Sequence, residues 1–347
     1  MKVLVILAVC ALTVAAVPIP EEERINGENG WYVPQANGSF IWVSIEEGEQ
    51  MLDELEKQEE MQSRLLPVPV TFYLYTNRNP SKGQKITESF KSISESEFDA
   101  SNPTRFVIHG WIQSYTAGMN KDICAAWLAR GKYNVIIVDW ARARSVDYAS
   151  SVAAVAKTGE KVASMINYLV ESFAMSLEET VVIGHSLGAH VAGYAGKNTK
   201  KGLLHTIVGL DPALPLFSYN KPKKRLNAND ANYVESIQTN GGTLGFLKPI
   251  GKGAFYPNGG KSQPGCPLDV TGACSHECSC SYYAEAVARD NFSSMRCDDY
   301  KKAVNNKCDS FYSGVKMGTV TNANAYVATG DYYVPVHSSS PYGFDDV

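Results

Sequence analysis

The strongest candidate for chemistry in this sequence is a serine between two glycines, in Gly184-His185-Ser186-Leu187-Gly188. The run before it, 180–183, is β-branched and apolar, and the run after it, 189–195, favours a helix. A strand, a sharp turn and a helix in this order form a nucleophile elbow, which presents a serine hydroxyl at the edge of a sheet. Glycines at 184 and 188 allow strand and helix to approach closely around a residue with unusual backbone angles. The pattern therefore predicts Ser186 as a nucleophile.

A serine hydroxyl is a weak nucleophile, so a histidine base must lie within hydrogen-bond reach. In elbow-type hydrolases the order along the chain is serine, acid, histidine. Only His276 and His337 follow Ser186 with room for an acid between. His337 lies in a tail rich in Ser, Pro and Gly, whereas His276 lies in a cysteine-anchored loop before an expected helix at 282–289. We therefore predict His276 as the base.

The acid that orients this histidine should follow a strand directly. Asp211 does so, because the apolar run 206–210 ends at Asp211-Pro212. Asp230 and Asp269 are alternatives, but one lies in a polar run and the other in a small loop, so we expect surface roles for both. Asp211 is the predicted acid.

Backbone N–H groups must stabilise the oxyanion of the tetrahedral intermediate. One should come from Leu187, directly after the nucleophile, and the other from a loop after an earlier strand. The run 105–108 ends at His109-Gly110-Trp111, which predicts Trp111 as the second donor, with its indole as a wall of the acyl pocket. We interpret His109 as a structural residue that fixes this loop.

These residues need a scaffold that places them at one edge of a sheet. Short apolar runs alternate with helical patterns along the chain. Strands are expected at 70–75, 105–108, 134–138, 180–183, 206–210 and 233–239, and helices at 121–130, 153–173 and 190–197. This alternation predicts a mostly parallel central sheet with helices on both faces, and the polar residues lie at the carboxyl ends of its strands. Together with the elbow, it predicts a single catalytic domain with the α/β-hydrolase fold.

The segment before this domain has two parts. Residues 1–16 have a basic start, an apolar stretch and a small-residue end, which indicates a signal peptide and a secreted, extracellular protein. No other apolar run approaches the length of a membrane span, so no transmembrane anchor is expected. Residues 17–64 are acidic and offer little for a core, so we interpret them as an extension or propeptide that lies against the main domain, 65–347. Residues 53–61 are a candidate helix and Arg64 a candidate processing point.

Composition excludes some classes of protein and suggests modifications. The chain has 347 residues, 44% of them hydrophobic, and a formal net charge of −4, without a basic patch that would favour nucleic acid. Clustered cysteines in a secreted chain favour disulfides over a metal site. Asn37-Gly38-Ser39 and Asn291-Phe292-Ser293 match the N-glycosylation pattern, at Asn37 and Asn291.

Five motifs also resemble the pancreatic-lipase family, in particular its insect neutral lipases and phospholipases A1. They are, in chain order, 184–190, 209–213, 255–260, 263–266 and 274–276. The resemblance covers about residue 66 onward. It implies the same roles as the residues themselves: Ser186 as nucleophile, Asp211 as acid, His276 as base, and Trp111 with Leu187 as the oxyanion hole.

The resemblance also implies disulfides and a lid. Cys266 and Cys274 resemble the pair that bounds the family's lid, and Cys297–Cys308 resembles another family disulfide. Only 267–273 lie within the lid, which is too short for an amphipathic cover. Short lids in this family accompany hydrolysis of phospholipids or galactolipids more than of triacylglycerols, without interfacial activation. Cys124 resembles a position whose usual partner is missing, so it is expected to pair with Cys278 or Cys280.

Two further features of the family are incomplete here. The calcium loop keeps Arg225, Asn227 and Asp230, but Asn227 and Pro222 stand where acids would be, so no strong calcium site and no other cofactor are expected. The chain ends too soon for the family's C-terminal β-sandwich, so no colipase-type partner is expected.

The sequence thus predicts a secreted serine ester hydrolase whose partner is a lipid substrate at a membrane or emulsion surface: phospholipid, galactolipid or acylglycerol. A triacylglycerol lipase is one alternative. A yolk or storage protein that binds lipid on the same scaffold without turnover is another. Such proteins typically lose the serine or its motif, and this chain keeps both.

Overall fold

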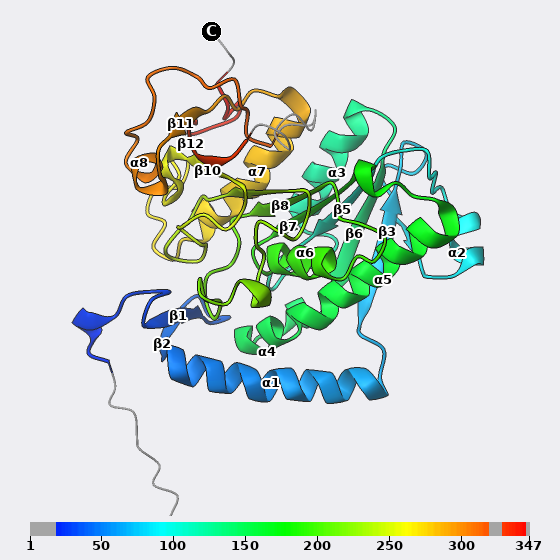
Figure 1. The fold of residues 1–347 in the computed structure, drawn as a ribbon, viewed down its shortest axis with the longest axis horizontal. Helices are drawn as coiled ribbons and strands as arrows, with labels where there is room; N and C mark the ends of the chain where they lie inside the picture. Colours follow the sequence, from blue (N-terminus) through cyan, green and yellow to red (C-terminus); the bar gives the residue numbers. More distant parts are fainter. Residues whose placement is uncertain (1–18, 319–327, 345–347) are drawn as a thin grey trace, which may run out of the picture.

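A twisted β-sheet forms the centre of the molecule (Figure 1). The computed structural model describes residues 19–318 and 328–344, so the expected signal peptide lies outside the described residues. Within these ranges the sheet has ten strands, in the order β11-β12-β10-β9-β8-β7-β5-β6-β3-β4. They are β3 (Val70–Tyr75), β4 (Gln84–Ile86), β5 (Thr104–Ile108), β6 (Asn134–Trp140), β7 (Thr180–His185), β8 (Thr206–Leu210), β9 (Tyr233–Ile237), β10 (Gly253–Pro257), β11 (Met295–Cys297) and β12 (Gly330–Val334).

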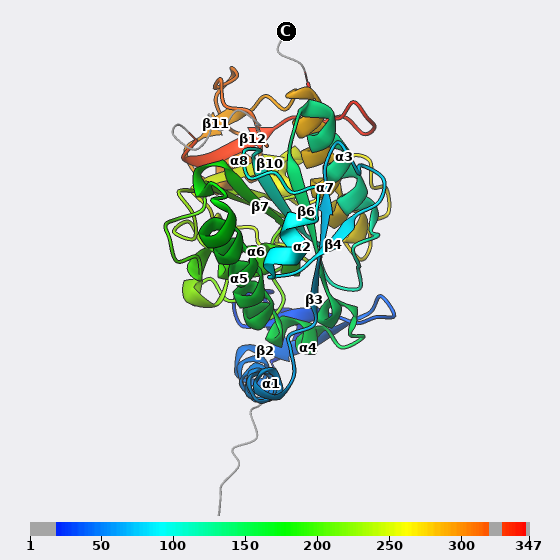
Figure 2. The same cartoon turned by 90° about the vertical axis from the view of Figure 1, so that its right-hand side faces the viewer.

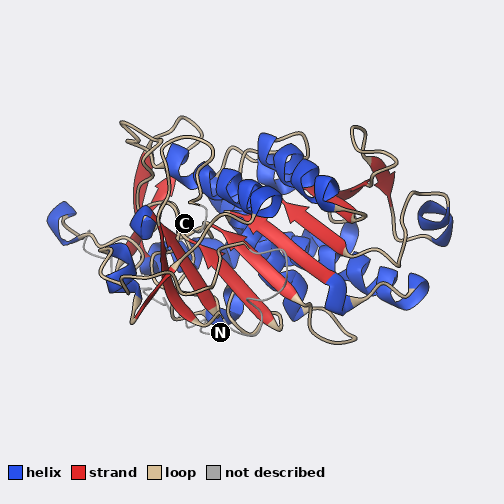
Figure 3. Cartoon of the chain, turned by 90° about the horizontal axis from the view of Figure 1, so that it is seen from above, coloured by secondary structure: helices blue, strands red, loops and turns tan. Residues whose placement is uncertain are grey.

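Neighbouring strands from β12 to β6 run parallel, and antiparallel strands close both edges. Helices cover both faces of the sheet (Figure 3). They are α2 (Phe90–Ser94), α3 (Gly118–Arg130), α4 (Tyr148–Ala153), α5 (Val155–Phe173), α6 (Leu187–Lys197), α7 (Ala273–Arg289) and α8 (Tyr300–Val304). The predicted α/β-hydrolase architecture is confirmed. No helix among the described residues has the length and apolarity needed to cross a membrane.

Alternate side chains of each strand enter different cores, as the two-residue period of a strand requires. In β7, Val182 packs into the core that α5 and α6 share, whereas Val181 and Ile183 pack into the core beneath α3 and α7. Both faces of the strand are buried, which explains its continuous apolar run. The sheet is thus fixed from both sides, and the ends of its strands become rigid points of attachment.

The segment before the sheet contributes more to the fold than predicted. Its strands β1 (Gly30–Pro34) and β2 (Phe40–Ser44) form an antiparallel hairpin, followed by α1 (Ile45–Leu65). Trp31 and Val33 are 1% and 3% exposed and belong to the main core. The expectation that residues 17–64 offer little for a core is therefore wrong. Figure 2 shows α1 end-on, beside α4 and away from the sheet.

The helix α1 is longer than the candidate at 53–61, because a capping box begins it. Ser44 Oγ accepts a hydrogen bond from the Glu47 N–H, and the Glu47 carboxylate accepts one from the Ser44 N–H at 3.0 Å. Arg64 lies in the last turn of this helix rather than in an open linker. The predicted helix at 153–173 corresponds to α5, which begins at Val155, and Ala153 instead ends the preceding short helix α4.

Candidate active site

The predicted nucleophile lies in a sharp turn between β7 and α6. Ser186 has backbone angles φ 56° and ψ −122°, which non-glycine residues rarely adopt. A Cβ at Gly184 would lie 2.1 Å from the Gly188 carbonyl oxygen, and one at Gly188 would lie 2.3 Å from the Ile108 carbonyl oxygen. Only glycine fits at either position, so the motif predicted the local backbone correctly.

The predicted acid is held by backbone donors directly after β8. Asp211 is fully buried, and its Oδ1 accepts hydrogen bonds from the Thr239 N–H at 2.7 Å and the Asn240 N–H at 3.0 Å. Gly245 lies against the same carboxylate, where a Cβ would approach Oδ1 to 2.4 Å. These three residues, which the sequence analysis missed, fix the direction in which the second oxygen of Asp211 points.

That second oxygen meets the predicted base. Asp211 Oδ2 lies 2.5 Å from His276 Nδ1, and both side chains are buried. His276 was predicted in a loop before a helix at 282–289. It belongs instead to the first turn of α7. Asp269 accepts hydrogen bonds from the Cys274 and Ser275 N–H groups at 3.1 and 2.8 Å, so it stabilises the start of α7.

Ser186 and His276 line the same cavity, which has a volume of about 240 Å³. Its other walls are mostly apolar and come from several parts of the chain: Pro34, Gln35, Gly38, Phe40, Trp111, Ile112, Tyr148, His185, Leu244, Thr271, Ala273 and Glu277. The structure thus places the predicted nucleophile and the predicted base on one mostly apolar cavity, with the predicted acid behind the base.

The predicted oxyanion loop approaches the nucleophile closely. A Cβ at Gly110 would lie 2.9 Å from Ser186 Cβ. The loop is fixed by Gln113, whose Oε1 accepts from the Gly110 N–H at 3.0 Å and whose Nε2 donates to Glu277 at 2.8 Å. Trp111 donates its indole N–H to the Ser145 carbonyl at 2.7 Å and lines the cavity, and Leu187 begins α6. No local pattern predicts this role of Gln113, because its partner Glu277 on α7 is 164 residues away.

Histidines near the site have structural contacts. His109 is fully buried, with Nε2 at 3.2 Å from Asp139 Oδ1 and Nδ1 at 3.0 Å from the Gly110 carbonyl, which agrees with a role in fixing the loop. Burial lowers the pKa of His185 to about 4, and its Nε2 lies 3.3 Å from the His276 carbonyl. His185 is therefore neutral and contacts the backbone of His276.

His190 ties α6 to the loop after Asp211. Its Nε2 lies 2.7 Å from the Ala213 carbonyl, and its Nδ1 accepts from the Leu226 N–H at 3.1 Å. Burial lowers the pKa of His190 to about 3. Because Nδ1 is used as an acceptor, protonation would break the bond to Leu226. His337, the alternative base, instead stacks on Phe344.

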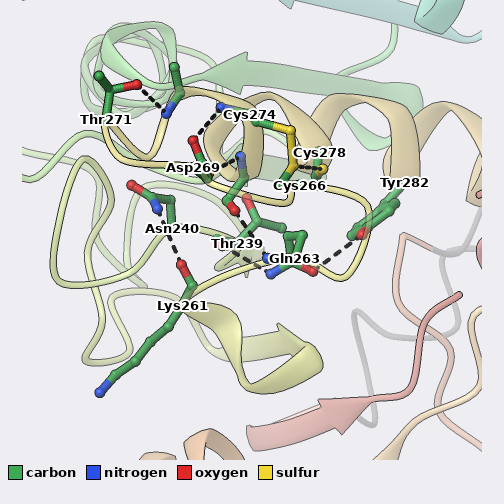
Figure 4. The surroundings of a disulfide bond; sticks show 12 residues. Thr239, Asn240, Lys261, Gln263, Cys266, Asp269, Thr271, Cys274, Cys278 and Tyr282 are labelled. Carbon is green, nitrogen blue, oxygen red and sulfur yellow. Dashed lines mark hydrogen bonds between the residues drawn. A yellow bond between two sulfur atoms is a disulfide. The ribbon is translucent and has the colours of Figure 1, made fainter. Parts of the chain in front are cut away.

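Two predicted disulfides are present, Cys266–Cys274 and Cys297–Cys308. Figure 4 shows the first of them with Cys278 beside it, its Sγ 3.6 Å from that of Cys266. Cys124, Cys278 and Cys280 are free thiols within the described chain, so the predicted pairing of Cys124 is wrong. Burial raises the pKa of the Cys124 thiol to about 12, which keeps it unreactive.

Hydrogen bonds of Gln263 hold the segment that leads into the loop closed by Cys266–Cys274. Gln263 donates its amide to the Thr239 and Pro257 carbonyls at 2.9 and 3.0 Å and accepts from Tyr282 at 3.2 Å. Figure 4 shows this glutamine joined by hydrogen bonds to Thr239 and to Tyr282 of α7. Beyond it, Leu268 and Val270 extend outward and are 94% and 91% exposed.

At the partial calcium loop, the ammonium group of Lys197, from the end of α6, contacts the oxygen atoms that would face a cation. Lys197 Nζ lies 2.7 Å from the Arg225 carbonyl and 2.5 Å from Asp230 Oδ2. Both Asp230 oxygens also accept from Asn227, at 2.9 and 2.8 Å. Calcium needs six to eight oxygen ligands, and one carboxylate neutralised by an ammonium does not fit it. Asp230 is 3% exposed, so the expectation of a surface role was wrong.

The two predicted glycosylation sites differ in exposure. Asn37 is exposed in the turn between β1 and β2. Asn291 is 2% exposed, and its amide donates to Glu285 at 3.0 Å and to the Gly343 carbonyl at 3.3 Å. The folded chain leaves no room for a glycan on Asn291.

Comparison with known proteins identifies the family. A family model described as Lipase matches residues 42–342, which include the elbow, Asp211 and His276. The chain belongs to the lipase family. The match begins within β2, so it includes part of the N-terminal segment as well as the sheet.

Relatives in the lipase family include active and inactive proteins by name. The chain is 34% identical over 264 residues to pancreatic triacylglycerol lipase of guinea pig (Cavia porcellus), covering 70% of this chain and 57% of that protein. The human (Homo sapiens) pancreatic triacylglycerol lipase is also 34% identical, over 270 residues, with 71% and 58% covered. The mouse (Mus musculus) inactive pancreatic lipase-related protein 1 is 35% identical over 274 residues, again with 71% and 58% covered. The chain therefore matches just over half the length of these relatives.

Among solved structures, the α/β hydrolase MGS-M1 from a deep-sea metagenome library matches at a TM-score of 0.30 and 15% identity, covering 52% of this chain and 66% of that one. Likeness this slight adds nothing to the fold assigned from the strand order.

Proposed function

We propose that this member of the lipase family is a secreted carboxyl-ester hydrolase of acyl glycerolipids, with Ser186, His276 and Asp211 as its catalytic triad. The 2.5 Å contact between Asp211 Oδ2 and His276 Nδ1, together with the cavity that His276 and Ser186 both line, carries the proposal. The two disulfides and the apolar N-terminal sequence support secretion.

The geometry supports a two-step acyl transfer. Asp211 accepts a hydrogen bond from the Nδ1–H of His276, which keeps the ring proton on Nδ1. Nε2 is left with its lone pair and takes the proton of Ser186 as Oγ attacks the ester carbonyl. The backbone N–H groups of Trp111 and Leu187 stabilise the oxyanion, and His276 returns the proton to the leaving alcohol. Water, activated by the same histidine, then hydrolyses the acyl-enzyme.

We further propose a preference for lipids with polar head groups over triacylglycerol. The loop closed by Cys266–Cys274 is short and anchored through Gln263, so it offers no amphipathic helix to cover the cavity. Its exposed Leu268 and Val270 lie next to Thr271 at the cavity wall, where aliphatic side chains favour contact with a lipid surface.

The test is acyl release from triolein, phosphatidylcholine and monogalactosyldiacylglycerol by the full chain and by Ser186→Ala. We expect faster release from the two polar lipids, and a loss of about 10⁴-fold or more in Ser186→Ala. Faster release from triolein would contradict the head-group preference. Hydrolysis retained in Ser186→Ala would refute the triad, and an inactive, folded wild-type chain would favour the lipid-binding alternative.

A further inference from the structure

The N-terminal hairpin reaches the cavity that contains Ser186. Pro34 and Phe40, which pair with each other across β1 and β2, line this cavity, as do Gln35 and Gly38 in the turn. These residues lie about 150 positions before the nucleophile in the sequence, and the sequence analysis assigned them to an extension outside the catalytic domain. One wall of the cavity is therefore built by this segment.

The hairpin is fixed to the loops that hold the acid. Trp31 is buried and donates its indole N–H to the Phe217 carbonyl at 3.0 Å, in the loop after β8. Asn26 donates its amide to the Gly242 and Thr243 carbonyls at 3.0 and 3.1 Å, in the loop after β9. These loops begin at Asp211 and at its backbone donors. The same two loops thus position both the hairpin wall of the cavity and Asp211.

The helix after the hairpin is attached by ion pairs. Its acidic residues pair with basic residues of the domain: Glu49 with Lys221 at 2.6 Å, Glu56 with Lys224 at 2.8 Å, Glu59 with Arg142 at 2.8 Å and Glu60 with Lys157 at 2.6 Å. Single exposed pairs contribute little, but a row of them sets the orientation of the helix. The hairpin and α1 are therefore integral parts of the folded domain.

We propose that the β1–β2 hairpin is the wall of the acyl pocket that sets which acyl chain lengths the enzyme accepts, with Phe40 as the main determinant. The inference rests on the proposed function. Phe40 is half-buried and lines the cavity, whereas the adjacent Ile41 is on the other face of β2, is 50% exposed and does not line it. The remaining large apolar side chains of the cavity are those of Trp111, Ile112, Tyr148 and Leu244. A bulky side chain in the wall of an apolar pocket excludes the far end of a long acyl chain, so it limits the chain length that the pocket accepts.

The experiment compares kcat/KM for the butyrate, octanoate and laurate esters of p-nitrophenol, which need no lipid surface. Phe40→Ala enlarges the pocket, and we expect the laurate-to-butyrate ratio to rise about 10-fold, the scale of methylene discrimination in apolar pockets. Phe40→Trp narrows it and should lower the ratio. Ile41→Ala is the matched control and should leave the laurate-to-butyrate ratio unchanged. Thermal unfolding checks that each variant is folded.

The outcomes separate this inference from the proposed function. An unchanged ratio in both Phe40 variants would overturn the inference while the triad stands. An equal rise for all three esters in Phe40→Ala would also overturn it, because the hairpin would then be a cover that blocks entry. Ester hydrolysis that persists in Ser186→Ala would instead refute the proposed function itself.

Discussion

Replacing Asp211 with Asn tests the triad while it keeps the shape of the buried side chain. The contacts of the carboxylate determine how the amide must settle. Asp211 Oδ1 faces two backbone donors, so the asparagine oxygen should remain there and its NH₂ should face His276 Nδ1. Nδ1 must then be an acceptor, which moves the ring proton to Nε2 and leaves no base for Ser186. The wrong tautomer costs about 10⁴-fold in kcat in a comparable triad.

The amide can escape this state only by rotating. Its NH₂ would then face the Thr239 and Asn240 N–H groups, and each buried donor without a partner costs about 1–3 kcal/mol. Two of them cost about 4 kcal/mol, so about one molecule in 10³ is rotated and active, at about 1.4 kcal/mol for each tenfold change. We therefore expect kcat to fall by about 10³- to 10⁴-fold.

The assay is steady-state hydrolysis of p-nitrophenyl butyrate, with the unfolding midpoint in urea as a check on folding. Asp230→Asn is the matched control, because that buried aspartate lies in the lysine-filled loop rather than beside His276. It should lower stability and leave kcat within a few-fold. A folded Asp211→Asn enzyme with more than about a tenth of wild-type kcat would refute the tautomer reasoning.

Three further predictions concern stability. Burial lowers the pKa values of His185 to about 4 and of His190 to about 3, from 6.5, so below pH 6.5 the unfolded chain binds protons that the folded chain does not. As the pH falls below 6.5, the free energy of unfolding should decrease by up to about 1.4 kcal/mol per pH unit for each histidine, until the pH reaches the folded-state pKa of that histidine. A urea midpoint that stays constant from pH 7 to pH 5 would contradict this. Lys197→Met leaves Asp230 buried without its cation and should lower the free energy of unfolding by about 2–3 kcal/mol, less than for a fully buried pair because Lys197 is partly exposed. A chelator should leave the wild-type midpoint unchanged, and a fall would show that a metal ion contributes there.

The sequence was most informative where one local motif dictates the backbone. The glycines of the elbow, the strand before it and the order of acid and histidine predicted three residues that the fold brings together. The same reasoning failed for His276, which was expected in a loop. Asp269 accepts hydrogen bonds from the first turn of α7, so the helix begins at Ala273, before the predicted start at 282. Local propensity alone does not show such a cap.

Contacts between distant segments were the other limit. The acidic segment 17–64 was predicted to lie against the main domain, but no local pattern shows which residues receive it. The charges of its Glu-rich run at 46–60 pair with basic residues about 80 to 170 positions away. Trp31 was the available signal of a buried segment, since a tryptophan in an acidic leader needs an apolar environment. Lys197 gave no signal, because its two oxygen partners come from a loop about 30 residues later.

The lysine at the end of α6 changes how the loop that carries Asp230 depends on its surroundings. A bound metal ion leaves when its concentration in solution falls below its dissociation constant, and the structure it stabilises then loosens. The ammonium of Lys197 is attached to the same chain, so its local concentration is set by the length of the side chain and is independent of the medium. The loop that packs on His190 is therefore expected to keep its shape in fluids rich in phosphate, carboxylates or other calcium-binding anions.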